Sequence, residues 1–538
     1  MSLVKSKTIE VTASMEQFEE AGSFIRQRLE QNLINKEIIT ETMLVFEALF
    51  HNLLEQGFNE DTLVTIRTKK TFGELNITIG FEGKAFVQSS EDPALCSPED
   101  LIINAYGDRI AYSYSAGYNN IRIVTKRNYQ QVFLFSIVAI VLGIIVSIPI
   151  HYTIDIESLI NVETQVTFPL IRLFSNAMLM VGAPVTFFSL LKNLTETYVV
   201  SQRYSSARRL QIKVIITSVI SVVLAFAVSL FVSALFMHHE GYLEGMGGFE
   251  GAPAFSEMIS ELVPDSIIKP FTTLMPFPLI VVALLITYAL CAAGKYFDSL
   301  KRAIDACYTL FSNLLQVVMF TLPFFSFVAV VYLLIASGPG ELWLLVKLLI
   351  TGIASVSAMA IFYLIRLLIG HVKVGPFVKK LIPLLRENFS IGSVINAVPY
   401  NVRYCTRNYG MDRKQTSEKL SILSQINLDG NCFLIMLLSM IFIFFLGEDY
   451  NLLNIIVIAV LVVFMSYGAP NQPGSILIGM LIITLYLKAD VMMVVAIYAE
   501  VFFGALQNLI NVTGNIVTIA IEDQAQKRTA QRITSKTG

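Results

Sequence analysis

Charged residues are scarce in this 538-residue sequence. Asp, Glu, Lys and Arg make up 15% of the chain, against about 25% in an average soluble protein. Hydrophobic residues make up 54%, and the mean hydropathy is +0.64. This balance is typical of a protein that lies mostly in lipid. Acidic and basic residues nearly cancel, with a net charge of −2, so no positive field indicates a nucleic-acid partner.

Cysteine is also scarce, and its spacing excludes two further classes of site. The five cysteines form no CxxC pair, so the sequence contains neither a disulfide framework nor a zinc pattern. There is no P-loop, no HExxH, and no GxSxG with catalytic partners. We therefore expect a protein that is not an enzyme.

Long apolar segments dominate the chain after residue 127. Each has roughly the 20 residues that a membrane-spanning helix needs. We predict a membrane domain at 128–523 with eight spans, followed by a tail at 524–538. The spans are Val132–Ile150, Leu170–Leu194, Ile212–Phe236, Phe271–Ala293, Leu310–Ala336, Leu342–Ile369, Leu420–Leu446 and Val491–Ile521.

Two more apolar stretches, at about 377–409 and 452–488, are interrupted. The first contains Pro383 and Pro399, and the second is broken at 468–475 by GAPNQPGS. Lipid cannot satisfy the backbone groups that such breaks expose. We therefore predict two re-entrant helical hairpins with buried tips, a pattern that indicates a transporter's binding site. Ordinary spans kinked by proline are the alternative, and they fit the second stretch less well than the first.

A stripe of polar residues marks the last span. Its members are Glu500, Gly504, Gln507, Asn508, Asn511 and Asn515. Their spacing places them on one face of a helix. At membrane depth this face must be hidden from hydrocarbon, which favours a pathway or a binding site. Hydrogen bonding between packed helices is the alternative.

Residues 1–127 have a soluble composition. Alternation at 7–12 predicts a strand, and apolar periodicity predicts helices at 15–35 and 37–54. Further strands are expected near 63–67, 75–79, 109–115 and 120–124, with a helix at 101–106. We predict a small α+β domain with an antiparallel sheet.

Basic residues gather in alternate loops of the membrane domain. Clusters occur at 203–213, 295–302, 366–380 and 527–536, whereas the loops between them are acidic. The positive-inside rule therefore predicts a multi-pass protein of the cell (inner) membrane with both termini in the cytoplasm. The first hairpin would then enter from the cytoplasm and the second from outside.

Three short motifs resemble those of the glutamate transporter homologues, the dicarboxylate/amino acid:cation symporters. NLDGN at 427–431 resembles their NMDGT, GAPNQPG at 468–474 their second hairpin tip, and NVTGN at 511–515 their NVTGD. The likeness spans about residues 128–523. It implies a homotrimeric secondary transporter in which a transport domain slides past a fixed scaffold, as in an elevator, and carries a small-molecule solute with a cation.

Departures from the family pattern imply a different solute. Family members that carry acidic amino acids hold the substrate with an Arg and an Asp, whose positions here are Gln507 and Gly504. The likeness therefore implies a neutral or smaller solute, recognised by hydrogen bonds. The candidate solute-binding residues are Ser393, Asn396, Asn431, Asn471, Gln472, Gly504, Gln507, Asn508 and Asn511.

The likeness also implies a cation site. Its candidate ligands are Asn427, Asp429, Asn511 and Asn515. The family's sodium-binding aspartate in NVTGD is Asn515 here, and a supporting tyrosine is Ser218. Asp429 could bind Na+ or carry a proton, and an internal hydrogen-bonded acid is the alternative.

The N-terminal domain resembles the GHKL ATPase fold, and most closely the anti-sigma-factor serine kinases. The cues are Glu47-Ala48-Leu49, Gly83, and the closing strand at 121–124. His51 stands where the likeness expects a Mg²⁺-binding Asn, and the adenine-binding Asp is missing. The sequence therefore disfavours ATP binding and predicts a regulatory module with a cytoplasmic protein partner. A transporter-like solute sensor signalling through this module, or an ion channel, remains as an alternative function.

Overall fold

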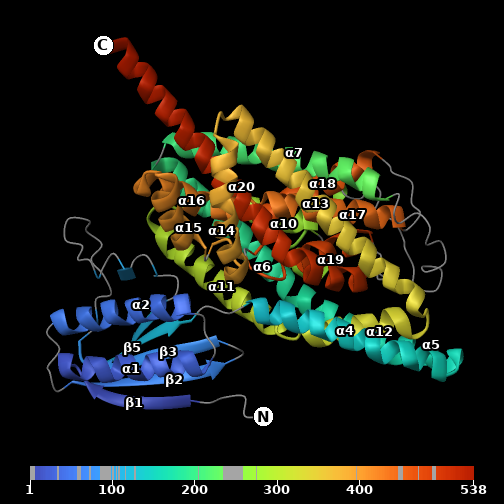
Figure 1. Ribbon diagram of the computed structural model, residues 1–538, viewed down its shortest axis with the longest axis horizontal. Coiled ribbons are helices and arrows are strands. Elements are labelled where there is room, and N and C mark those ends of the chain that lie inside the picture. The colour runs from blue at the N-terminus through green and yellow to red at the C-terminus, as the bar shows by residue number, and fades with distance from the viewer. Residues whose placement is uncertain are drawn as a thin grey trace. The chain divides into compact units, whose positions relative to one another are not determined.

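The computed structural model describes most of the chain (Figure 1). The described residues are 6–32, 36–56, 62–71, 74–84, 86, 99, 102–103, 106, 110–115, 117–125, 129–203, 205–233, 259–273, 276–395, 397–445, 452–470, 472–487 and 492–537. They form two compact units, Met1–Asn128 and Tyr129–Gly538.

The described residues of the first unit form a five-stranded antiparallel sheet and two helices. The strands are β1 (Ser6–Thr12), β2 (Leu63–Thr71), β3 (Glu74–Glu82), β4 (Ile110–Ser115) and β5 (Tyr118–Val124), in the spatial order β1-β2-β3-β5-β4. The helices are α1 (Met15–Gln31) and α2 (Lys36–Glu55). The helix expected at 101–106 lies mostly outside the described residues.

Strand alternation builds the core of this unit. Ile66 faces Ile79 across β2 and β3, and Ile79 faces Ile121 across β3 and β5. All three are buried, while Leu63 and Tyr118 are exposed. The period of two in a strand puts these apolar side chains on one face, where they share a hydrophobic core with residues of α1 and α2.

The second unit is a helical bundle. Its helices are α4 (Tyr129–Thr153), α5 (Ile156–Val162), α6 (Phe168–Arg203), α7 (Ser205–Ser233), α9 (Lys269–Thr273), α10 (Pro276–Cys291), α11 (Phe297–Met319), α12 (Leu322–Ile335), α13 (Leu342–Ile369), α14 (Val374–Ile391), α15 (Val398–Tyr404), α16 (Arg413–Ile426), α17 (Asp429–Phe445), α18 (Leu452–Gly468), α19 (Ser475–Leu487) and α20 (Met492–Thr537). Short 3₁₀ turns and π-helical segments join some of them, at Glu163–Thr167, Gly294–Tyr296, Pro339–Glu341 and Cys405–Tyr409.

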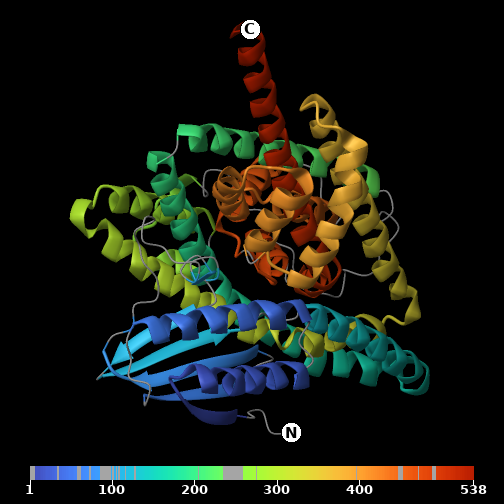
Figure 2. The same cartoon turned by 60° about the vertical axis from the view of Figure 1, so that its left-hand side comes forward.

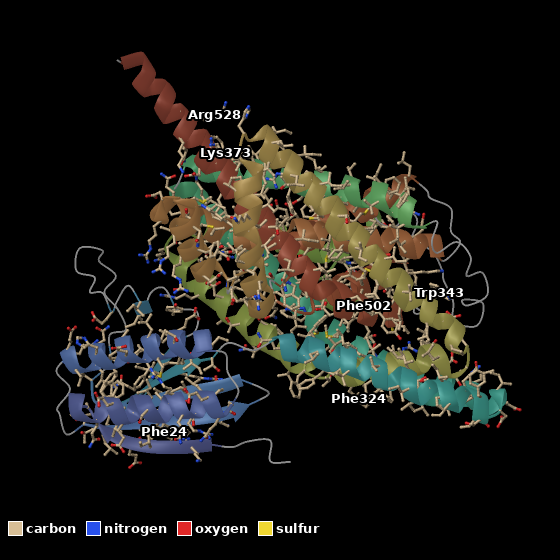
Figure 3. All side chains as sticks on the ribbon, in the orientation of Figure 1. Phe24, Phe324, Trp343, Lys373, Phe502 and Arg528 are labelled. Atoms are coloured by element: carbon tan, nitrogen blue, oxygen red, sulfur yellow. The ribbon has the colours of Figure 1, made fainter. Side chains whose placement is uncertain are left out.

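Six helices in the described part of the chain are long and apolar enough to cross a membrane, or seven if the bent pair Pro276–Cys291 and Gly294–Met319 is one span. Large apolar side chains such as Phe324 and Trp343 point outward from this unit (Figure 3) and are 55% and 62% exposed. Such a surface suits lipid rather than water. The prediction of a polytopic membrane protein is confirmed.

One expected span is divided in the structure. The stretch Leu310–Ala336 forms α11 and α12, separated at Phe320 and Thr321. Pro323 lies in the first turn of α12, where the missing backbone N–H of proline is tolerated. In the middle of a continuous helix the same proline would remove a hydrogen bond and break the helix. The stretch Phe271–Ala293 contains part of α9 and the whole of α10, and the two residues between these helices lie outside the described part of the chain.

Each interrupted stretch forms two helices joined by a short break. α14 and α15 are joined through residues 392–397, and α18 and α19 through residues 469–474. Gly474, just before α19, has a φ of +98°, which L side chains rarely adopt. The glycine therefore permits the turn that starts α19.

The last helix, α20, organises the second unit. It packs against α13, α14, α16, α17 and α19. Figures 1 and 2 show its C-terminal turns extending beyond the bundle. The segment at 524–538, expected as a tail, continues α20 as helix to Thr537.

Candidate solute and cation site

The polar stripe of α20 faces the protein interior. Glu500, Gln507, Asn508, Asn511 and Asn515 are all less than 10% exposed. Buried polar groups need hydrogen-bond partners, and here the partners come from α17, from α19 and from the turn after α14. The stripe therefore joins three separate segments of the chain.

Four of the buried residues form an amide cluster, defined here as Asn431, Ser475, Gln507 and Asn511. The Gln507 side chain donates to Asn431 Oδ1 and bonds the Ser475 hydroxyl. Asn511 Nδ2 donates to Asn431 Oδ1 over 2.8 Å. Asn431 Nδ2 has no hydrogen-bond partner among the described residues. The cluster thus carries a free donor in a buried, uncharged setting.

Gly430 allows α17 to approach α20 closely. Its N–H donates to Asn511 Oδ1 over 2.7 Å. A Cβ atom at this position would lie only 2.6 Å from the backbone oxygen of Gln507. The glycine of the NLDGN motif is therefore needed at the point where the two helices meet.

Glu500 holds the first turn of α19 against α20. Its carboxylate accepts the N–H groups of Gly474 over 2.7 Å and Leu477 over 3.1 Å. The first N–H groups of a helix lack internal partners, and the helix dipole favours an anion there. A Cβ atom at Gly504 would lie 2.7 Å from Glu500 Oε1, so the absent side chain makes room for this carboxylate.

The remaining predicted solute ligands do not belong to the amide cluster. Asn508 Nδ2 donates to the Gly392 carbonyl over 2.9 Å, and the neighbouring Ser393 is buried. The amide of Gln472 is instead engaged by Ser312 and Gln316 of α11. Asn396 and Asn471 lie outside the described residues.

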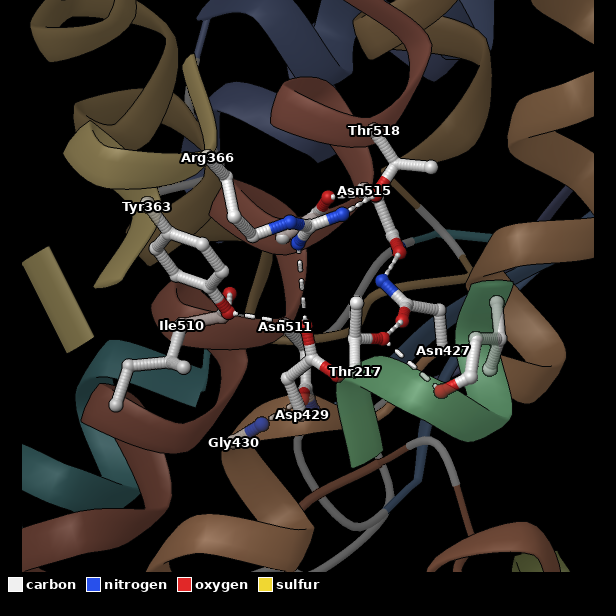
Figure 4. Close-up of polar contacts among 12 residues, drawn as sticks. Thr217, Tyr363, Arg366, Asn427, Asp429, Gly430, Ile510, Asn511, Asn515 and Thr518 are labelled. Carbon is white, nitrogen blue, oxygen red and sulfur yellow. Dashed lines mark hydrogen bonds and ion pairs between the residues drawn. The ribbon is translucent and has the colours of Figure 1, made fainter. Parts of the chain in front are cut away.

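The predicted cation ligands lie together where α17 begins (Figure 4). Asn427 Nδ2 donates to Asn515 Oδ1 over 2.8 Å, and the Thr217 hydroxyl donates to Asn427 Oδ1 over 3.3 Å. Asp429 is fully buried, and its Oδ2 lies 3.8 Å from Arg366 Nη1. From the sequence, Arg366 was expected only as one of the basic residues at 366–380 that set the orientation, so its contact with Asp429 was not predicted.

A model of the sodium:dicarboxylate symporter family matches residues 132–524. The chain belongs to this family. The resemblance to the cation symporters is thereby confirmed, and the protein is a symporter-type secondary transporter for a small-molecule solute. Comparison with curated proteins finds no significant match.

The family's description names sodium, yet the predicted ligands do not fit a sodium ion here. Small hard cations require several oxygen ligands. The side-chain oxygens of Asn427, Asn511 and Asn515 each accept a hydrogen bond from a protein donor. Asp429 faces a guanidinium group.

Proposed function

We propose that this transporter carries a small, polar, uncharged solute, which the amide cluster recognises by hydrogen bonds. The supporting observation is the cluster itself, whose four side chains carry no charge. Asn431 Nδ2 supplies a buried donor that no described residue satisfies. An unpaired buried polar group costs free energy until a ligand satisfies it.

Charge also argues against a dicarboxylate, the solute that the family's description names. A carboxylate is held best by arginine or by free helix N–H groups. Gln507 offers only an amide, and the first N–H groups of α19 are already bound to Glu500. A second carboxylate there would be repelled by the first.

The proposal includes an elevator movement, and the same contacts support it. Gly430, Glu500 and Asn508 tie α17, α19 and the turn after α14 to α20, so we assign these segments to the moving body. We assign α4 and α12, which pack closely on one another, to the scaffold. We retain the homotrimer, the two re-entrant hairpins, the cell membrane and the cytoplasmic termini as predictions.

The N-terminal unit acts in this proposal as a regulatory, protein-binding module of degenerate GHKL type. His51, at the position of the expected Mg²⁺ ligand, is 43% exposed, and its Nδ1 lies 3.6 Å from Glu55. Titration of the full chain with Mg²⁺-ATP should release no heat of binding. Saturable binding would contradict the degenerate assignment.

Uptake into proteoliposomes tests the proposal. With a panel of small amides and of amino acids that have zero net charge and polar side chains, we expect accumulation driven by a cation gradient. Gln507→Ala should lower it at least about tenfold, because it removes the bonds to Asn431 and Ser475. Gln415→Ala, at an exposed site in α16, is the matched control and should leave uptake unchanged.

Other outcomes of the same assay identify the rival functions. Solute binding without flux would indicate a sensor, which the attached N-terminal unit favours. Current without coupled uptake would indicate a channel. Either outcome would contradict the proposed transport.

A further inference from the structure

Arg366 is a charged residue that points into the membrane unit. It lies in the last turn of α13, and its side chain is only 15% exposed. Nη2 donates to Thr518 of α20 over 2.9 Å, and the guanidinium lies over the rings of Phe362 and Tyr363. A charged side chain that is held inward at the end of an apolar span, and not turned toward water, is costly and indicates a function.

The buried carboxylate of Asp429 is the counterpart of this cation. Its Oδ2 lies 3.8 Å from Arg366 Nη1 and accepts from the Tyr363 hydroxyl over 3.4 Å. Its Oδ1 has no hydrogen-bond partner among the described residues. A buried carboxylate without an opposite charge is strongly unfavourable, and Arg366 supplies that charge.

Gly514 permits this close arrangement. A Cβ atom there would lie 2.9 Å from Asp429 Oδ2 and 2.8 Å from the Tyr363 hydroxyl oxygen (surroundings in Figure 4). The backbone of α20 thus closes one side of the site, which leaves the guanidinium as the group that compensates the carboxylate. Arg366 approaches from α13, opposite the start of α17 that carries Asp429.

Electrostatics then decide whether a metal cation can also bind. Arginine stays protonated under all ordinary conditions, so the Arg366–Asp429 pair is neutral. A sodium ion at Asp429 would give the buried site a net positive charge and would be repelled by the guanidinium. The amide oxygens of Asn427 and Asn515 already accept one hydrogen bond each, so a sodium ion would have to share them with their present donors.

We propose that Arg366 is a tethered counter-cation that takes the place of a bound sodium ion beside Asp429. The site formed by Asn427, Asp429 and Asn515 therefore binds no Na+ in this chain, and any coupling cation binds elsewhere. The inference concerns the ion and not the solute, so it stands or falls separately from the proposed function.

Thermal unfolding of the purified full-length protein in NaCl and in equimolar choline chloride tests this inference without measuring transport. The baseline is the double variant Arg366→Gln/Asp429→Asn, which lacks both charges and keeps a polar side chain at each position. Wild type should show the same Na+-dependent shift in Tm as the baseline. Arg366→Gln removes the positive charge and leaves the Asp429 carboxylate without a counter-charge. Its Tm should show an additional Na+-dependent rise of about 2 °C or more.

Arg366→Lys tests whether the positive charge of Arg366, and not the shape of its side chain, excludes Na+, because lysine keeps a cation beside Asp429. It should behave like wild type toward Na+. A Na+-dependent shift in wild type larger than that of the double variant would overturn the proposal, as would an Arg366→Gln protein that folds and ignores Na+. Should Arg366→Gln fold only in NaCl or not at all, wild type and the double variant still test the proposal. In that case the proposal is supported if these two proteins show the same Na+-dependent shift in Tm.

Discussion

Glu500→Ala is expected to lower the Tm of the purified protein by several degrees and to abolish solute uptake. The substitution leaves the N–H groups of Gly474 and Leu477 buried without an acceptor. Losing hydrogen bonds to a charged group at a helix start costs about 3 kcal/mol. Since these bonds fix α19 to α20, Ser475 would also move away from Gln507. Differential scanning fluorimetry and liposome uptake measure both effects.

Two further variants separate charge from acceptor capacity. Glu500→Gln keeps an oxygen that can accept one N–H, so its loss should be smaller than that of Glu500→Ala. Glu157→Ala removes an exposed carboxylate from α5 and should change stability by less than about 0.5 kcal/mol. A Glu500→Ala protein with wild-type Tm and uptake would show that the carboxylate does not hold α19.

Gly430→Ala is expected to destabilise the protein by about 1–3 kcal/mol and to abolish solute binding. The new Cβ atom would lie 2.6 Å from the backbone oxygen of Gln507 and 2.9 Å from Asn511 Oδ1. A backbone atom cannot move aside as a flexible side chain can, so α17 and α20 must separate. This separation would pull Asn431 away from Gln507 and dismantle the amide cluster.

Gly375→Ala is the matched control for this prediction. Gly375 lies in the first turn of α14, and a Cβ atom there would meet nothing within 4 Å. Alanine is the better helix former by up to about 1 kcal/mol, so this variant should be as stable as wild type or more stable. If Gly430→Ala bound solute with wild-type affinity, the close approach of α17 and α20 would not matter for the site.

Periodicity in the sequence predicted the buried face of α20. Gln507, Asn508 and Asn511 were expected on one side of a helix, and each makes a hydrogen bond to another segment of the chain. This succeeds because a polar stripe in an apolar helix has only one low-energy direction, toward other polar groups. Local spacing was sufficient for these residues.

Contacts that depend on how helices rotate against each other could not be predicted in this way. Arg366 lies near the end of an apolar span, where a basic residue ordinarily faces water, and only the rotation of α13 against α20 turns it toward Asp429. Glu500 finds its partners because the fold brings the start of α19 beside it. Gln472 is turned to α11 instead of the amide cluster for the same reason.

Comparing solutes of the same shape but different charge tests the central claim most directly. Asparagine has an amide in place of the side-chain carboxylate of aspartate, and succinamide has amides in place of both carboxylates of succinate. With binding measured by calorimetry on the purified protein, the uncharged member of at least one pair should bind at least about tenfold tighter. Gln507→Ala should remove that preference. Tighter binding of aspartate or succinate, unchanged by Gln507→Ala, would contradict recognition of a neutral solute by the amide cluster.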